Sequence, residues 1–140
     1  MNPKLIIIIA FPLLSFGACS QKSIKENEAD IIQTTYLLLS PIEFNKKILT
    51  EPGVIIDVRT GSEQKKGMLK NAISLDIFQD AFEAEIDKLD RAKIYYVYCG
   101  SGGRSAEACE LMKKKGFTHV IDLDGGYSHW KNEGLPVEVR

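Results

Sequence analysis

Short apolar runs alternate with amphipathic stretches along residues 35–140, and this alternation indicates an α/β domain. Three runs, 54–58, 94–98 and 120–123, are rich in β-branched and aromatic residues, which is typical of strands buried on both faces of a parallel sheet. Shorter runs predict two more strands, and apolar positions three or four apart predict helices. The further expected elements are strands at 36–39 and 72–75, one helical turn between Gly61 and Gly67, helices at 41–49, 81–89 and 104–115, and a last helix from Gly125-Gly126 to Gly134.

Helix boundary signals support this order of elements. Ser40-Pro41-Ile42-Glu43 has the pattern of a capping box with proline at the first helical position. Gly116 is placed to end the helix at 104–115. Because strands and helices alternate, we expect an α/β fold with a mostly parallel central sheet and helices on both faces.

The first 34 residues differ in composition from the rest. A short positive lead precedes an almost wholly apolar run at 5–14, and small residues then lead to Cys19. This layout is typical of an export signal, and the run is shorter than the roughly 20 residues that a membrane span needs. We therefore predict a signal peptide at 1–18, a polar tether at 19–34 and a domain at 35–140. The alternative for the apolar run is a buried strand or a short helix.

The residues before Cys19 sharpen this prediction. Phe16-Gly17-Ala18-Cys19 resembles the lipobox of bacterial lipoproteins, although Phe16 replaces the commoner leucine. The resemblance implies cleavage before Cys19 and attachment of lipid to Cys19. The protein would then be exported and anchored to a membrane by its lipid, facing the periplasm or the cell exterior. Ordinary secretion with a free Cys19 is the alternative.

Charge and composition exclude some classes of partner. The chain has 18 Lys and Arg against 19 Asp and Glu, so it lacks the basic surplus of a nucleic-acid-binding protein. The run 113–115 of three lysines fits the solvated end of a helix. Two histidines without a cysteine pair do not form the pattern of a zinc site. We expect a monomer that uses no metal and no organic cofactor.

The stretch from Cys99 to Ser105 carries the candidate chemistry, because it lies between a predicted strand and a predicted helix. Ligands bind at this edge of open α/β sheets. Its glycines allow successive backbone N–H groups to turn inward, and the start of the helix adds more donors. Arg104 adds a permanent cation that suits oxyanions. We expect this positive field to favour the thiolate form of Cys99, which attacks an anionic sulfur donor and holds a persulfide.

A structural interpretation of the same residues stays open. A tight glycine turn behind a buried, inert cysteine would give a similar pattern. Cys109, in the following helix, is either a resolving thiol for Cys99 or a core residue. About five residues of helix separate Cys109 from Arg104, or ~7 Å of axial rise, and this separation favours the core.

Several spaced motifs resemble those of rhodanese-like domains, over about 35–139. The order of the motifs along the chain makes the resemblance more specific than any one of them. The matching segments are 56–59, Glu63 with Gly67, 72–73, 99–105, 123–126 with Trp130, and 134–137.

The resemblance implies a rhodanese-like fold and sulfur transfer through a persulfide on Cys99. The donor would be a small sulfur-bearing anion such as thiosulfate, and the acceptor a thiol or cyanide. Asp57 and Arg59 would support the loop by charge pairing; an ordinary surface pair is the alternative. The loop positions that would cradle the substrate are Gly100, Ser101, Gly102, Gly103, Arg104 and Ser105.

Three positions depart from the family pattern. Met68 stands where a histidine is usual, Asn71 where a glycine is usual, and Gln64 where an aromatic residue is common. These positions lie in a connecting segment, so we expect altered local packing with the chemistry retained. They weaken any transfer of substrate preference from the family to this chain.

The length of the loop separates the remaining hypotheses. Four residues lie between Cys99 and Arg104, whereas cysteine phosphatases place five between the two. The shorter loop favours sulfur over a tetrahedral phosphoryl group. The alternatives to a sulfurtransferase are a non-catalytic binding module on the same fold and a cysteine phosphatase or arsenate reductase.

Overall fold

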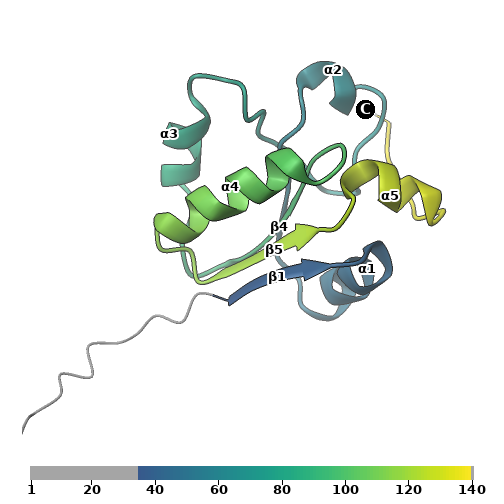
Figure 1. The fold of residues 1–140 in the computed structure, drawn as a ribbon, viewed down its shortest axis with the longest axis horizontal. Coiled ribbons are helices and arrows are strands. Elements are labelled where there is room, and N and C mark those ends of the chain that lie inside the picture. The colour runs from purple at the N-terminus through teal and green to yellow at the C-terminus, as the bar shows by residue number, and fades with distance from the viewer. Residues whose placement is uncertain (1–34, 140) are drawn as a thin grey trace, which may run out of the picture. The chain divides into compact units, whose positions relative to one another are not determined.

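A single five-stranded parallel sheet organises the domain, and the computed structural model describes residues 35–139 (Figure 1). The strand order is β1-β5-β4-β2-β3, and each neighbouring pair is parallel. The predictions for the signal peptide, the tether and Cys19 lie outside the described residues. The strands are β1 Thr35–Leu39, β2 Val54–Asp57, β3 Ile73–Ser74, β4 Ile94–Tyr98 and β5 His119–Leu123. The helices are α1 Pro41–Thr50, α2 Gly61–Gln64, α3 Phe82–Asp87, α4 Gly103–Lys114 and α5 Gly126–Asn132.

Helices cover both faces of the sheet, which confirms the predicted fold class. Alternate residues of a strand point to opposite faces. Tyr95 and Val97 of β4 therefore join one core with α3 and α4, whereas Tyr96 and Tyr98 join a second core with α1 and α5. No helix in the described part of the chain is long and apolar enough to span a bilayer.

Local signals set the ends of the helices. The predicted capping box is present: the Ser40 side chain accepts from the Glu43 N–H, and the Glu43 carboxylate accepts from the Ser40 N–H. A second capping box, formed by Thr60 and Glu63, begins α2. Gly116 has a φ of 84° just beyond the end of α4, the left-handed geometry that a helix end commonly requires.

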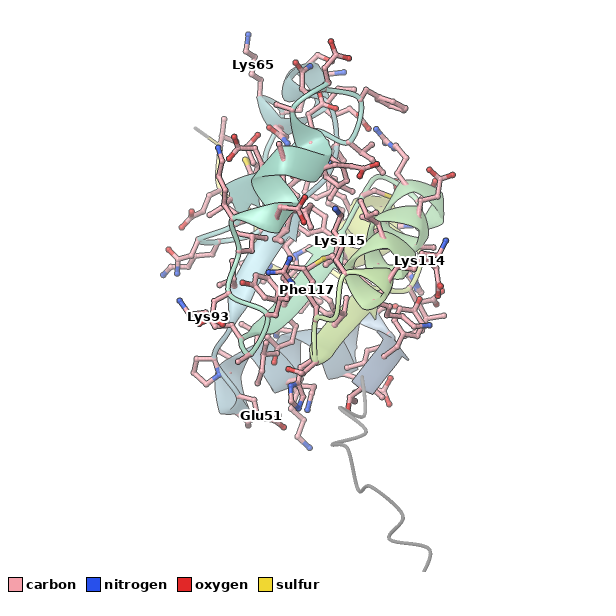
Figure 2. All side chains as sticks on the ribbon, turned by 90° about the vertical axis from the view of Figure 1, so that its left-hand side faces the viewer. Glu51, Lys65, Lys93, Lys114, Lys115 and Phe117 are labelled. Carbon is pink, nitrogen blue, oxygen red and sulfur yellow. The ribbon has the colours of Figure 1, made fainter. Side chains whose placement is uncertain are left out.

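The far end of α4 confirms the interpretation of the lysine run. Lys113 and Lys114 form the basic last turn of α4, where positive charge is favourable. Figure 2 marks Lys114 and Lys115 at this end, beside Phe117. Lys115 binds the carboxylate of Asp87, at the end of α3, at 2.9 Å.

Parallel pairing brings the carboxyl ends of β2, β4 and β5 to one edge of the sheet. The connection after β4 is the stretch from Cys99 to Gly102, and it leads directly into α4. The connection after β5 leads into α5. The sheet therefore places the cysteine loop between the ends of its two neighbouring strands.

One buried polar residue of the sheet has hydrogen bonds for only one of its two side-chain oxygens. Asp122 of β5 is buried, and its Oδ2 accepts a bond from the Tyr36 hydroxyl at 3.3 Å. Its Oδ1 is buried without a hydrogen-bond donor among the described residues. Burial raises the pKa of Asp122 from 3.8 to about 6. The folded state therefore holds this proton to a higher pH than the unfolded chain does.

Asp122→Asn is expected to stabilise the protein at pH 8 but not at pH 4. The stability that the protonated carboxyl provides is lost as the pH rises from about 4 through about 6, whereas an amide stays neutral. A shift of two pKa units corresponds to about 2–3 kcal/mol, which urea unfolding at the two pH values would detect. The exposed Asp124→Asn is the control, with an expected change within about 0.5 kcal/mol. A less stable Asp122→Asn protein at pH 8 would contradict the prediction.

Candidate active site

Cys99 lies directly after β4, beneath a loop that turns back over its sulfur. The backbone N–H of Gly102 donates to Cys99 Sγ at 3.1 Å. This inward turn requires Gly102 to adopt a φ of 105°, which side chains rarely permit. Cys99 has no exposed surface, while Ser101 and Gly103 above it are exposed. The sulfur is therefore buried, although residues of the loop that follows it are exposed.

The surroundings of the Cys99 sulfur favour its thiolate form. Burial by itself raises the pKa of the thiol. The Ser105 side chain and the backbone N–H groups of Ser101, Gly102 and Ser105 outweigh burial, so the pKa lies below its ordinary value. Hydrogen bonds of this kind stabilise the charged form of a nucleophile, whereas an inert core cysteine has a raised pKa.

Cys109 provides that contrast within the same chain. It is buried in α4, and burial together with the charge of Asp122 raises its pKa. Cys99 and Cys109 are both free thiols. The interpretation of Cys109 as a core residue is confirmed by its place in the cluster beneath α3 and α4.

Arg104 lies in the first turn of α4 and is paired with a carboxylate. Its Nη1 and Nη2 donate to the two oxygens of Glu63 at 2.8 and 2.7 Å. This bidentate pair lowers the pKa of Glu63 to about 2. Arg104 therefore holds the loop to α2 with both arms of its guanidinium.

Glu63 is a site residue whose role sequence reasoning missed. Its carboxylate accepts from the Thr60 N–H at 3.0 Å and from the Thr60 hydroxyl at 2.8 Å, in addition to Arg104. The capping pattern Thr60-Gly61-Ser62-Glu63 indicates the bonds between Glu63 and Thr60. Nothing in that pattern indicates the pairing of Glu63 with Arg104.

An exposed aromatic ring lies next to this ion pair. Phe78 is 68% exposed, and the Arg104 guanidinium carbon lies 5.8 Å from the centre of its ring. Phe78 lies between predicted elements, so it was not among the predicted site residues.

Asp57 and Arg59 form a buried pair, so the alternative of a surface pair is wrong. Arg59 Nη2 lies 2.6 Å from Asp57 Oδ2, and both side chains are nearly inaccessible. Arg59 also donates to the Gly67 carbonyl at 2.6 Å, and Tyr98 donates to Asp57 Oδ2 at 2.6 Å. The pair connects β2 to β4 and to the segment after α2.

The connection from this pair to the cysteine loop passes through Tyr127. The Arg59 guanidinium carbon lies 3.9 Å from the centre of the Tyr127 ring, and the Tyr127 N–H donates to the Cys99 carbonyl at 2.7 Å. Asp57 and Arg59 therefore contact the cysteine loop only indirectly, through Tyr127. Their effect on activity stays a prediction.

The three departures from the family pattern are accommodated in this connecting segment. Gln64 is buried and donates to the carbonyls of Asp57 and Arg59 at 3.1 and 2.8 Å. Asn71 has a φ of 61°, and asparagine tolerates this left-handed geometry better than most residues. Met68 is buried in the core beneath α1 and α5.

The start of α5 forms the support beneath the loop. Tyr127 and Ser128 donate their N–H groups to the carbonyls of Cys99 and Gly100, at 2.7 and 3.0 Å. Gly126, with a φ of 58°, permits this approach, since a Cβ at its position would lie 2.5 Å from the Cys99 carbonyl oxygen. Backbone thus packs on backbone here, with no room for a side chain.

Gly126→Ala is expected to displace the cysteine loop. The matched control is Gly134→Ala, because Gly134 has a similar φ of 68° but nothing within 4 Å of an added Cβ. The left-handed backbone geometry costs both variants about 1 kcal/mol of stability. Only in Gly126→Ala does the added methyl group also collide with the backbone of the cysteine loop. We expect urea unfolding to show a larger loss for Gly126→Ala, with at least a tenfold slower alkylation of Cys99 at neutral pH. Equal alkylation rates in the two variants would contradict this account of the loop.

Histidines and carboxylates do not gather into a metal site within residues 35–139. His119 is exposed at the start of β5, and His129 lies 3.8 Å from Asp124 and 3.7 Å from Glu133. The chemistry that the described site offers is that of the Cys99 thiolate and the N–H groups around it.

Comparison with known proteins gives several related chains. A sulfurtransferase of Allochromatium vinosum is 31% identical over 88 residues, which cover 63% of this chain and 80% of that protein. The thiosulfate sulfurtransferase GlpE of Actinobacillus pleuropneumoniae is 25% identical over 105 residues, covering 75% of this chain and 95% of that one. A tRNA uridine(34) hydroxylase of Streptococcus suis is 32% identical over 119 residues, covering 82% of this chain. The matched part spans only about a third of that longer protein, 36% of its length.

The fold has close counterparts among solved structures. The crystal structure of a rhodanese-related protein from Thermoplasma volcanium superposes with a TM-score of 0.67 and 30% sequence identity, covering 75% of this chain and all of that one. Residues 40–133 match the rhodanese-like domain family, a span that includes β2, the cysteine loop and α5. The chain therefore belongs to the family of rhodanese-like domains.

Proposed function

We propose that this protein is a sulfurtransferase that carries a sulfane sulfur as a persulfide on Cys99. The observation that supports this most directly is the N–H of Gly102 bound to Cys99 Sγ, within a loop that lowers the pKa of the thiol. A thiolate held by backbone donors is a competent nucleophile. The same donors suit the anionic groups of a sulfur donor such as thiosulfate.

The first half-reaction forms the persulfide. The Cys99 thiolate attacks the outer sulfur of thiosulfate, a new S–S bond forms to Cys99, and the bond between the two thiosulfate sulfurs breaks. Sulfite leaves with the electron pair of that bond. Cys99 has no exposed surface in the structure, so the donor reaches Sγ only after a local rearrangement around it.

The second half-reaction returns the thiolate. A nucleophilic acceptor, cyanide or a thiolate, attacks the outer sulfur of the persulfide. The S–S bond to Cys99 breaks, and its electron pair returns to the Cys99 sulfur. Throughout both steps the negative charge stays near the loop N–H groups, so the same donors stabilise the thiolate and the persulfide.

The pairing of Arg104 also bears on the choice of substrate. In the structure Arg104 is held by Glu63 with both arms of its guanidinium, so the loop offers mainly backbone N–H groups. The four-residue spacing between Cys99 and Arg104 gives a compact loop. Both features favour a sulfur substrate over a phosphoryl or arsenate group, which is the alternative function.

Cys99→Ser is expected to abolish thiocyanate formation from thiosulfate and cyanide. Serine keeps the size of the side chain but cannot form a persulfide. Cys109→Ala is the matched control, since it removes the other described thiol, and we expect it to keep at least a third of the wild-type kcat. Intact-mass measurement of wild-type protein after thiosulfate treatment should show a gain of about 32 Da that Cys99→Ser lacks.

Two outcomes would contradict the proposal. Equal thiocyanate formation by wild type and Cys99→Ser would leave a binding module as the better interpretation. Cys99-dependent turnover of an aryl phosphate or of arsenate, without sulfur transfer, would favour the phosphatase or arsenate reductase hypothesis instead.

We propose further that the domain works outside the cytoplasm on a lipid anchor. The support for this is in the sequence: the apolar run at 5–14, the lipobox-like residues before Cys19 and the polar stretch to residue 34. A lipid chain contributes about 0.8 kcal/mol per buried methylene, so two or more chains hold a protein at a membrane.

The anchor has a direct test. Protein extracted from membranes of its host should lack the first 18 residues and carry acyl mass on Cys19, as measured by intact-mass spectrometry. Cys19→Ala should lose the acyl mass and leave the membrane fraction, while Cys109→Ala should not. An unmodified Cys19 in wild-type protein would overturn the proposal.

A further inference from the structure

Phe78 lies at the carboxyl edge of the sheet, the edge that also carries the cysteine loop. Hydrogen bonds continue from β3 past the end of β2 and bring the chain there. The Leu75 N–H donates to the Asp57 carbonyl at 2.9 Å. The Ile77 N–H then donates to the Val58 carbonyl at 3.2 Å. The segment that leads to Phe78 is therefore tied to the same part of the sheet as the site.

A turn fixes the backbone of Phe78 itself. Its N–H donates to Asp76 Oδ1 at 3.0 Å, and the Gln79 N–H donates to the Asp76 carbonyl at 3.1 Å. The side chain of Phe78 is nevertheless 68% exposed. A ligand that contacts this ring therefore meets a backbone that is already ordered, which lowers the entropic cost of binding.

Arg104 connects the Phe78 ring to the cysteine loop. Its guanidinium carbon lies 5.8 Å from the centre of the ring, within the range of a cation–π contact. The same guanidinium lies against Gly100, where an added Cβ would be 3.0 Å from Arg104 Nη2 and 3.3 Å from Glu63 Oε1. Gly100 directly follows Cys99. The ring, the ion pair and the backbone next to the nucleophile therefore adjoin one another.

The chemistry of this surface suits a flat apolar group better than a second negative charge. Glu63 binds both arms of the Arg104 guanidinium, so the pair offers a ligand no net charge. The two side chains are 25% and 34% exposed for Arg104 and Glu63. A guanidinium plane and a phenyl ring both stack with aromatic or apolar groups. Cyanide and thiosulfate contain no such group, whereas an organic thiol can carry one.

We propose that Phe78 determines specificity for acceptors that are organic thiols with an aromatic or other apolar group beside the sulfur. This inference rests on the proposed role of Cys99 as the sulfur carrier. The acceptor thiolate attacks the outer sulfur of the Cys99 persulfide, and a new S–S bond forms. The bond from that sulfur to Cys99 breaks, its electron pair returns to Cys99, and the acceptor leaves as an organic persulfide. Phe78 binds the apolar group during the attack.

The first test measures alkylation of Cys99, which requires no sulfur transfer. The reagents are iodoacetamide and N-benzyl-iodoacetamide, and the Cys99 thiolate displaces iodide from either one. Mass spectrometry of the Cys99 peptide at neutral pH gives the ratio of the benzyl rate constant to the iodoacetamide rate constant. After division by the same ratio for free cysteine, we expect at least about fivefold in wild type and less than about twofold in Phe78→Ala.

Two further variants separate contact with the ring from a general effect. Phe78→Tyr keeps the ring, and its ratio should stay within about twofold of that of wild type. Leu49→Ala removes an apolar side chain that is 75% exposed on α1, and it should leave the ratio unchanged. Because the side chain of Phe78 is exposed, urea unfolding of Phe78→Ala should stay close to that of wild type.

The second test measures the transfer of sulfur to acceptors. Protein treated with thiosulfate is mixed with benzyl mercaptan or 2-mercaptoethanol, two thiols of similar acidity, at equal thiolate concentration. Intact-mass measurement follows the loss of the added sulfur, about 32 Da. We expect wild type to transfer its sulfur at least about threefold faster to the benzylic thiol, and Phe78→Ala to lose this preference.

Four results would overturn the inference: a wild-type alkylation ratio no higher than that of free cysteine, the same ratio in Phe78→Ala, an equal loss in Leu49→Ala, or transfer to the two thiols at equal rates. If thiosulfate adds no sulfur to Cys99 while the benzyl preference in alkylation holds, the sulfurtransferase proposal fails and the contact with the ring stands. Persulfide formation without any benzyl preference would refute only the role of Phe78.

Discussion

The contact between the start of α5 and the backbone of the cysteine loop is the constraint on which the site depends. Two N–H groups of α5 bind the carbonyls of Cys99 and Gly100, and Gly126 leaves room for no side chain between them. With those carbonyls held from below, the N–H groups of the loop are directed toward the sulfur. The geometry of the nucleophile is thus fixed by a helix that follows a different strand.

This arrangement explains why the parallel sheet matters for the chemistry. The neighbouring strands β4 and β5 end at the same edge, so the loop after one and the helix after the other meet there. On the other side of β4, the end of β2 provides the buried pair of Asp57 and Arg59. That pair reaches the loop through Tyr127, which contacts both. The loop thus continues from β4, is hydrogen-bonded by the helix that follows β5, and is supported through Tyr127 by the ion pair at the end of β2.

Many strands and helices of the fold were predictable from local sequence patterns. The strand at 94–98 was predicted at its observed bounds, and the capping box at Ser40 placed the start of α1 at Pro41. Interactions between distant residues were not predictable in this way. Glu63 and Arg104 are 41 positions apart, and nothing in the sequence near either one points to the other. Asp122 was expected only as part of a buried strand, because its unpartnered oxygen becomes visible when β1 and α4 are packed around it.

The pairing of Arg104 with Glu63 has a consequence for how ligands find the site. A lone arginine at the mouth of the loop would project a field that attracts anions from a distance of about a Debye length, ~8 Å at physiological salt. Here a carboxylate cancels that charge, and the attraction that remains comes from backbone dipoles that act only at close range. Encounter with a small anion is then governed by diffusion and fit, so its rate should vary little with ionic strength. Selectivity in such a site begins at contact, after the anion has already arrived.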